Sequence, residues 1–339
     1  GLQFGVGVAG GSEVILHSVN RLIEACGDDV VGGFHERLQL GRSRVLHTLI
    51  CKIRDSFSLS LHAWYLDDGT IVGDTMVVGK VLELIMEDGP RCSLHLNVDK
   101  TEVFLPKEDP RSRLTGIFSP NITRPLHGVK LLGGPARVDF DFCNELVMKR
   151  VAKPIGLMDA IAKINDPQCE LLLLRSCTSI SRLYFTMRTC PPRVFEYAQR
   201  SFDVAFCYSL KRIVTAFGPG FGDWKWRLPT LPFVFRGLGV YSAGDVLNYA
   251  FLASRLQSVG LQTKLLRHIG IVSPEPIFDD ALFVFNTSME TNLLSNPKAD
   301  AVTLLKRIWK FSMAQDIGAH VVVYIFNKIN FAIAKGVGA

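Results

Sequence analysis

The alternation of hydrophobic and polar positions divides the chain into a first part of short strands and a second part of helices. Aromatic and β-branched residues lie on both sides of an Asp-Gly pair within residues 62–74, which predicts a β-hairpin with its turn at that pair. A short strand is predicted at 93–98 and a second tight hairpin at 128–134. From Phe140 onward the hydrophobic period changes from 2 to 3.6 residues, so we place a domain boundary at 139–141.

Apolar positions at helical spacing predict helices in both parts. In the first part, one helix follows Ser12 and ends before Gly27, and another is capped by Asp74 and ends at Gly89. In the second part the predicted helices cover 144–164, 166–188, 191–217, 243–258, 263–268, 279–294 and 300–313. The aromatic stripe within 191–217 is interpreted as core, and the Gly- and Pro-rich segment 218–239 as a linker.

The composition is that of a globular intracellular protein. The chain has 339 residues, enough for about two domains, with 48% hydrophobic residues and a formal net charge of +6, which permits a polyanionic partner. Eight scattered cysteines without a Cys-x-x-Cys pair indicate thiols in a reducing compartment. The most apolar stretch, 321–334, is interrupted by polar residues and is too short for a membrane span. We therefore expect a fragment of a longer reading frame without signal peptide or transmembrane segment, located in nucleus or cytoplasm, and leave its oligomeric state open.

Two adjacent carboxylates, Asp67 and Asp68, are predicted at the tip of the first hairpin. Carboxylates on one turn suit a hard divalent cation, and two such cations suit phosphoryl transfer when a third acid comes from another strand. The alternative is a solvated surface turn, and the short pattern leaves both interpretations open.

Basic residues offer a second candidate. Within 41–55, four cations alternate with apolar positions, and they either neutralise phosphates or form the solvated face of a helix; these residues are Arg42, Arg44, Lys52 and Arg54. Lys100 follows a strand that we expect to return beside the hairpin, where an ammonium group could contact a triphosphate. A turn lysine is the alternative.

The N-terminal glycines give a competing pattern. Gly5, Gly7 and Gly10 form a Gly-x-Gly-x-x-Gly sequence before a helix, which is typical of dinucleotide binding. The segment that precedes Gly5 is too short to form the strand that such a turn requires. We retain a dinucleotide-dependent enzyme as an alternative.

The order of these features resembles the reverse transcriptases of non-long-terminal-repeat retrotransposons, of the plant reverse-transcriptase-like type. Residues Tyr65-Leu66-Asp67-Asp68 match the family's Tyr-x-Asp-Asp box, and segments 94–102, 128–133 and 231–239 match in the same order. The resemblance implies an α+β fold, with a partial right-hand polymerase palm of antiparallel sheet and helices followed by an all-helical thumb-like domain. The implied domains are a remnant of fingers and palm entry with a helix and a basic segment (1–47), a palm remnant (48–139), a thumb-like domain (140–217) and a linker with a C-terminal helical region (218–339).

The resemblance also implies a function and its site. It implies an RNA-directed DNA polymerase, a nucleotidyltransferase in which Asp67 and Asp68 bind Mg²⁺ and Lys100 lies near the incoming triphosphate. RNA template and DNA primer would be the partners. The implied nucleic-acid contacts are Tyr65, the basic residues of 41–55, and Gly128, Lys130 and Gly133 of the second hairpin.

Two parts of the family pattern are missing from this sequence. No earlier strand carries a metal-binding aspartate, since Asp28 and Asp29 are followed by Val30-Val31-Gly32-Gly33, and no Gln-Gly segment follows. Only 32 residues separate the two regions, counted from Val30 to Leu61. Without an acid from a second strand, two metals cannot be held together, so we expect weak Mg²⁺ binding and weak or absent polymerase activity. A non-catalytic nucleic-acid-binding fragment, or one that does not fold stably, remains an alternative.

Overall fold

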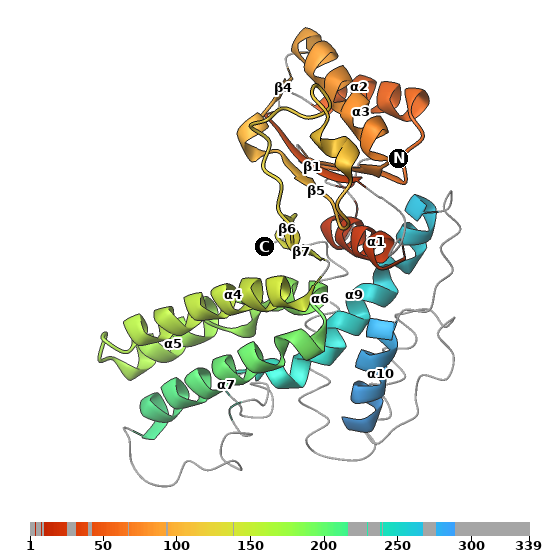
Figure 1. Ribbon diagram of the computed structural model, residues 1–339. Coiled ribbons are helices and arrows are strands. Elements are labelled where there is room, and N and C mark those ends of the chain that lie inside the picture. The colour runs from red at the N-terminus through yellow and green to blue at the C-terminus, as the bar shows by residue number, and fades with distance from the viewer. Residues whose placement is uncertain are drawn as a thin grey trace. The chain divides into compact units, whose positions relative to one another are not determined.

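A computed structural model describes most of the chain (Figure 1). The described residues are Phe4, Val8, 10–25, 32–39, 43–66, 68–92, 94–137, 139–215, Pro229, Leu238, 240–266 and 276–288. For 32–39, 43–45, Cys92 and Ser288 the backbone alone is described. The chain divides into a sheet unit, residues 1–142 with 258–274, and a helical unit, residues 143–257 with 275–339. Helices and small antiparallel sheets occur together, so the fold class is α+β.

The sheet unit contains a β-α-β-β-α-β arrangement. Its elements are β1 (Gly32–Gln39), α2 (Ser43–Ser56), β2 (Leu61–Tyr65), β3 (Asp68–Gly73), α3 (Thr75–Asp88), β4 (His95–Leu96) and β5 (Glu102–Phe104). The strand order is β2-β3-β1-β4, β5 also pairs with β1, and all pairs are antiparallel. The last strands therefore lie across β1 from the hairpin, the arrangement known as the split βαβ fold. Short 3₁₀ helices occupy Pro90–Cys92, Val98–Lys100 and Pro110–Arg113.

β1 was not predicted from the sequence, which indicated only a helix and a basic segment in residues 1–47. It begins with Gly32 and Gly33, which disfavour strands, and it lacks a clear alternation. β1 forms because it pairs along both of its edges. It pairs with β3 from Gly32↔Gly73 to Arg37↔Asp68, and with β4 and β5 on the other side. A predicted domain boundary at residue 47 therefore cuts through one continuous sheet.

The alternation along β2 sends its side chains into two cores. Leu61 and Ala63 join a cluster with Phe4 and the apolar face of α1 (Gly11–Ala25), whereas Trp64 joins a cluster with α2 and α3. Both clusters consist of side chains that are almost fully buried. The predicted helices α1 and α3 are confirmed, and the carboxylate of Asp74 caps α3 by accepting a hydrogen bond from Met76 N at 2.9 Å.

The glycines before α1 have a packing role in the described residues. A Cβ at Gly11 would lie 2.2 Å from the carbonyl oxygen of Phe4, whose own N–H donates to the carbonyl of Trp64 at 2.7 Å. Gly10 has φ of +69°, a conformation that glycine adopts at little cost. The close approach of Phe4 thus accounts for a glycine at the start of α1.

The second predicted hairpin is confirmed as β6 (Gly128–Leu131) and β7 (Gly134–Arg137). Its turn residues Leu132 and Gly133 have φ of +47° and +89°, typical of a two-residue hairpin turn. Buried Asn20 of α1 lies beside β7, where its Nδ2 donates to Pro135 O at 2.9 Å and its Oδ1 accepts from Arg137 N at 3.2 Å. One side chain thus pairs with the outer edge of β7 as a neighbouring strand would.

The helical unit is built from α4 (Phe140–Ile161), α5 (Pro167–Cys177), α6 (Tyr184–Thr189), α7 (Pro192–Thr215), α9 (Ala243–Leu266) and α10 (Pro276–Ser288), with a 3₁₀ turn at Ile180–Arg182. The first residues of α4 and the last of α9 belong to the sheet unit. The aromatic stripe of α7 is core, as expected, because Phe195, Phe202 and Phe206 are fully buried.

Two predicted helix boundaries are wrong. The helix expected at 166–188 is interrupted, because Thr178 Oγ1 donates to Leu174 O at 2.7 Å and the chain then turns through Ser179 into the 3₁₀ segment. The helices expected at 243–258 and 263–268 form one continuous α9. Segments 300–313 and 321–334, and all of 218–239 except Pro229 and Leu238, lie outside the described residues. No helix among the described residues is long and apolar enough to cross a membrane.

The N-terminus of α9 is capped from another helix. Asp203 of α7 accepts hydrogen bonds from Ser242 Oγ at 2.7 Å, Ala243 N at 2.7 Å and Gly244 N at 3.0 Å. A carboxylate at this end satisfies N–H groups that have no partner within the helix and complements the helix dipole.

We expect Asp203→Ala to lower the free energy of unfolding of the helical unit by about 2 kcal/mol, because it leaves these donors without their acceptor. Asp203→Asn should cost less, since its amide keeps one acceptor oxygen. Urea unfolding followed by circular dichroism measures both. Asp159→Ala, on the exposed side of α4, is the control and should unfold like the wild type; an equal loss in both variants would contradict the capping role.

Candidate functional site

The turn of the hairpin with the Tyr-x-Asp-Asp sequence lies two residues earlier than its Asp-Gly pattern predicts. Tyr65 pairs with Asp68, so β2 ends at Tyr65 and the turn begins at Leu66, which has φ of +56°. Asp68 is therefore the first residue of β3, where it is half-buried. Asp67, the other candidate carboxylate, lies outside the described residues.

Gly69 lies in β3 and not in the predicted turn, and its lack of a side chain serves packing. It pairs with Trp64, and a Cβ at Gly69 would lie 2.6 Å from Cζ3 of the indole ring. Trp64 is fully buried between β3 and the helices of its cluster. The absence of a side chain at Gly69 thus makes room for this ring, and the fit of the ring fixes the register of the hairpin.

A buried histidine supports the same tryptophan. Trp64 Nε1 donates to His62 Nε2 at 2.5 Å, and the two rings meet edge to face with centroids 5.8 Å apart. Burial lowers the pKa of His62 to about 4, with a smaller contribution from the positive charge of Arg54. Accepting this hydrogen bond requires a neutral imidazole, so the contact and the lowered pKa agree.

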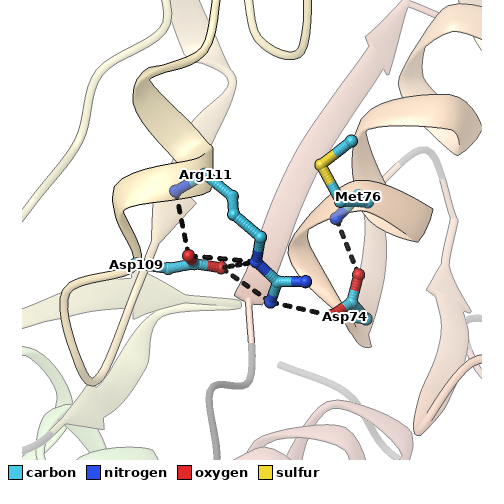
Figure 2. A network of polar contacts seen from close by, with 4 residues as sticks. All are labelled: Asp74, Met76, Asp109 and Arg111. Atoms are coloured by element: carbon cyan, nitrogen blue, oxygen red, sulfur yellow. Dashed lines mark hydrogen bonds and ion pairs between the residues drawn. The ribbon is translucent and has the colours of Figure 1, made fainter.

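A separate ion-pair network holds the acids that follow the hairpin (Figure 2). The Nη2 atom of Arg111 lies 2.9 Å from Asp74 Oδ2 and 2.9 Å from Asp109 Oδ2. Hydrogen bonds from the Arg111 guanidinium hold the pKa of Asp109 below its ordinary value. Asp74 is six residues beyond Asp68, about 20 Å along the strand. It stabilises the start of α3 and is too distant to share a ligand with Asp68.

The basic residues of 41–55 match the solvated-face interpretation where they are described. Lys52 forms an ion pair with Asp88 of α3, and Arg54 Nε lies 2.7 Å from Asp55 Oδ1. The opposite face of α2 is buried in the core, with Leu46, Leu49, Ile50 and Ile53. Arg42 lies outside the described residues, and for Arg44 only the backbone is described.

Lys100 is exposed, and its backbone N–H donates to Asn97 Oδ1 at 3.2 Å. The expectation that its strand returns beside the hairpin is wrong, because β4 and β5 pair with β1 and β1 separates them from β3. The reason is the strand β1 itself, which occupies the place that the prediction gave to the later strand.

The second hairpin brings Gly128, Lys130 and Gly133 together on β6 and its turn. Lys130 is exposed, and a Cβ at Gly128 would lie 2.6 Å from Cδ1 of Phe142. Packing against Phe142 accounts for the glycine at position 128, and a positive φ accounts for the glycine at position 133. Their contact with nucleic acid, like that of Tyr65, stays a prediction.

The strand beside the hairpin offers no acid at the position paired with Asp68. Arg37 pairs with Asp68, and Glu36, the one acid of β1, pairs with Gly69. In the described part of the chain, no group of three or more His, Cys, Asp and Glu residues could hold a metal ion. Sequence reasoning missed Arg37, because its position opposite Asp68 follows from pairing between distant segments.

We expect Gly69→Ala to lower the free energy of unfolding by about 1–3 kcal/mol, since the new methyl group overlaps the ring of Trp64. Urea unfolding followed by tryptophan fluorescence measures this loss. Gly156→Ala in α4 is the matched control, because a Cβ there meets nothing within 4 Å and helical alanine is favoured over glycine. Equal stability of Gly69→Ala and wild type would show that the ring does not need this space.

The lowered pKa of His62 predicts acid sensitivity. Its folded pKa of about 4 lies below the ordinary 6.5, so the unfolded chain takes up the proton first as pH falls. Full stability is present above about pH 6.5, and we expect about 2–3 kcal/mol to be lost between pH 7 and pH 4.5. Urea unfolding at the two pH values tests this. His62→Phe should lack this part of the pH dependence, whereas His47→Gln on exposed α2 should keep it. An unchanged dependence in His62→Phe would refute the assignment.

Neither protein-family models nor curated protein sequences match this chain.

Proposed function

We propose that this chain is a reverse-transcriptase-like protein, derived from an RNA-directed DNA polymerase, whose nucleotidyl transfer activity is weak or absent. Tyr65-Leu66-Asp67-Asp68 would be the remnant of the metal-binding hairpin. RNA template and DNA primer would be the ancestral partners, and Lys100 the residue that faced the incoming triphosphate.

The sheet around the hairpin supports this ancestry. In the sheet, β3 of the hairpin pairs antiparallel with β1. Side chains of α2 and α3 pack in one cluster with side chains of the hairpin. A β-α-β-β-α-β sheet also occurs in proteins of other functions, so the motif on the hairpin carries the assignment and the topology only agrees with it.

The observation that carries the loss of activity is the pairing of Arg37 with Asp68. Phosphoryl transfer by two metal ions depends on several carboxylates close together, because their charge offsets that of the ions. A basic residue at the paired strand position supplies no acidic ligand for such ions, and its charge has the wrong sign to attract them. Acidic residues of this region are also engaged elsewhere, with Asp74 and Asp109 held by Arg111.

The alternatives receive less support. The ion pairs of Lys52 and Arg54 weaken the case for residues 41–55 as the main phosphate-binding surface, because their charge is balanced by Asp88 and Asp55. For the dinucleotide alternative, Gly5 and Gly7 lie outside the described residues, and the positive φ of Gly10 accounts for that glycine without a ligand.

Primer extension on an RNA template with Mg²⁺ tests the proposal. We expect the wild type to incorporate no more nucleotide than the double variant Asp67→Ala/Asp68→Ala. Robust incorporation by the wild type that the double variant abolishes would refute the loss of activity. Equal incorporation by both proteins would indicate a contaminating polymerase. Repurification removes such a contaminant before the two proteins are compared.

The pairing of Arg37 with Asp68 also predicts a gain of cation binding. Arg37→Asp replaces the cation opposite Asp68 by an acid, so we expect about tenfold tighter binding of Mn²⁺, measured by electron paramagnetic resonance. Asp68→Asn in the same background should reverse the gain. Arg113→Asp, which makes the same charge change on an exposed 3₁₀ turn, is the control. A gain as large in the control would mean that overall charge is responsible.

A further inference from the structure

Helix α2 (Figure 1) carries a histidine and a cysteine one turn apart, away from its core face. The Sγ atom of Cys51 lies 3.6 Å from Nε2 of His47. His47 is exposed and Cys51 is half-buried. Neither residue belongs to the apolar clusters of the sheet unit. Solvent therefore reaches a pair of groups that the fold itself does not use.

The helix holds these two side chains in place. Residues four apart on a helix lie on one face, with Cβ atoms about 5–6 Å apart. The other face of α2 is anchored, because four aliphatic side chains pack in the cluster with Trp64: Leu46, Leu49, Ile50 and Ile53. A ligand that needs both the thiol and the imidazole thus meets them already paired, which lowers the entropic cost of binding.

The distance between the two atoms matches a tetrahedral metal site. Zn²⁺ binds cysteine sulfur at about 2.3 Å and histidine nitrogen at about 2.0–2.1 Å. At the tetrahedral angle, these two bonds place sulfur and nitrogen about 3.5–3.6 Å apart. The observed separation of 3.6 Å fits this geometry. A thiol–imidazole hydrogen bond spans a similar distance, and metal titration separates the two interpretations.

The cations that follow Cys51 on α2 are each balanced by an acid. Hydrogen bonds to Asp55 raise the pKa of Arg54, and the charge of Cys51 makes a smaller contribution, which places the guanidinium near the sulfur. The Arg54 charge is offset by Asp55, whose Oδ1 lies 2.7 Å from Arg54 Nε. Lys52 is offset by Asp88 in the same way. A divalent ion at the sulfur would therefore not be repelled by an unbalanced cation of this segment.

We propose that His47 and Cys51 bind a divalent metal ion that favours sulfur and nitrogen ligands, such as Zn²⁺. Thiolate and imidazole are ordinary ligands of Zn²⁺, whereas Mg²⁺ prefers oxygen. Binding would release the thiol proton of Cys51 to solvent, because the metal coordinates the thiolate. The described residues contain no group of three or more potential ligands, so water would complete the coordination. The site uses neither Asp67 nor Asp68 and involves no nucleic acid, so it goes beyond the proposed function.

Alkylation of the full chain by iodoacetamide, followed by peptide mass spectrometry, tests the proposal because it measures each cysteine separately. With thiols kept reduced by a phosphine, we expect a small excess of Zn²⁺ to slow alkylation of Cys51 by about tenfold, since coordination occupies the reactive thiolate. A chelator should restore the rate, and a large excess of Mg²⁺ should not replace Zn²⁺. Cys169 and Cys177 of α5, which are also accessible, are internal controls and should react equally fast with and without Zn²⁺.

His47→Gln tests the second ligand, because it removes the imidazole and leaves Cys51 in place. We expect half-protection of Cys51 to need at least about tenfold more Zn²⁺ in this variant, since even the loss of an outer-shell partner costs that much affinity. His127→Gln, at an exposed histidine paired with Asp139, is the matched control and should behave like the wild type. Circular dichroism should show both variants folded, because both side chains are exposed.

Equally fast alkylation of Cys51 with and without Zn²⁺ would overturn the proposal, as would full protection of Cys51 in His47→Gln. Equal slowing of all accessible cysteines would also overturn it, because this result indicates general binding of Zn²⁺ to thiols. Asp67→Ala/Asp68→Ala should keep the protection of the wild type. Failure of this site is therefore distinguishable from the outcome of primer extension.

Discussion

The sheet unit depends on the pairing of β1 with strands on both of its edges. β3 and β2 form a hairpin on one side, and β4 and β5 lie on the other. A two-stranded hairpin alone is marginally stable in water, whereas three or more strands with covered faces are stable. Because β1 pairs with strands on both sides, it fixes the register between the hairpin and the later strands.

The same pairing determines what the hairpin can do. A strand in the centre of such a sheet places one residue opposite each position of β3, and opposite Asp68 that residue is Arg37. In the proposed polymerase hairpin, the position paired with Asp68 therefore carries a basic residue, whereas two-metal chemistry needs an acid from a second strand. Stability of the sheet is compatible with the proposed loss of catalysis, since hydrogen bonding between strands is made by the backbone and does not depend on the residue at position 37.

Sequence reasoning succeeded where the determining interactions are local. The hairpins, α1, α3 and α7 follow from alternation, caps and helical spacing, and Asp74 caps α3 as expected. It failed where distant segments decide. β1 begins with two glycines and exists through its partners, and the turn at Leu66 is fixed by the fit of Trp64 over Gly69. For the candidate site, the motif proposes Tyr65 and Asp68, whereas the position of Arg37 opposite Asp68 could not be found without the register.

Asn20 has a consequence for the hairpin β6–β7. A strand at the edge of a small sheet exposes N–H and C=O groups that can pair with another chain. The amide of Asn20 already occupies the carbonyl of Pro135 and the N–H of Arg137 on the outer edge of β7. These two backbone groups are therefore not available to a strand of a second molecule, so the Asn20 side chain disfavours edge-to-edge aggregation at β7.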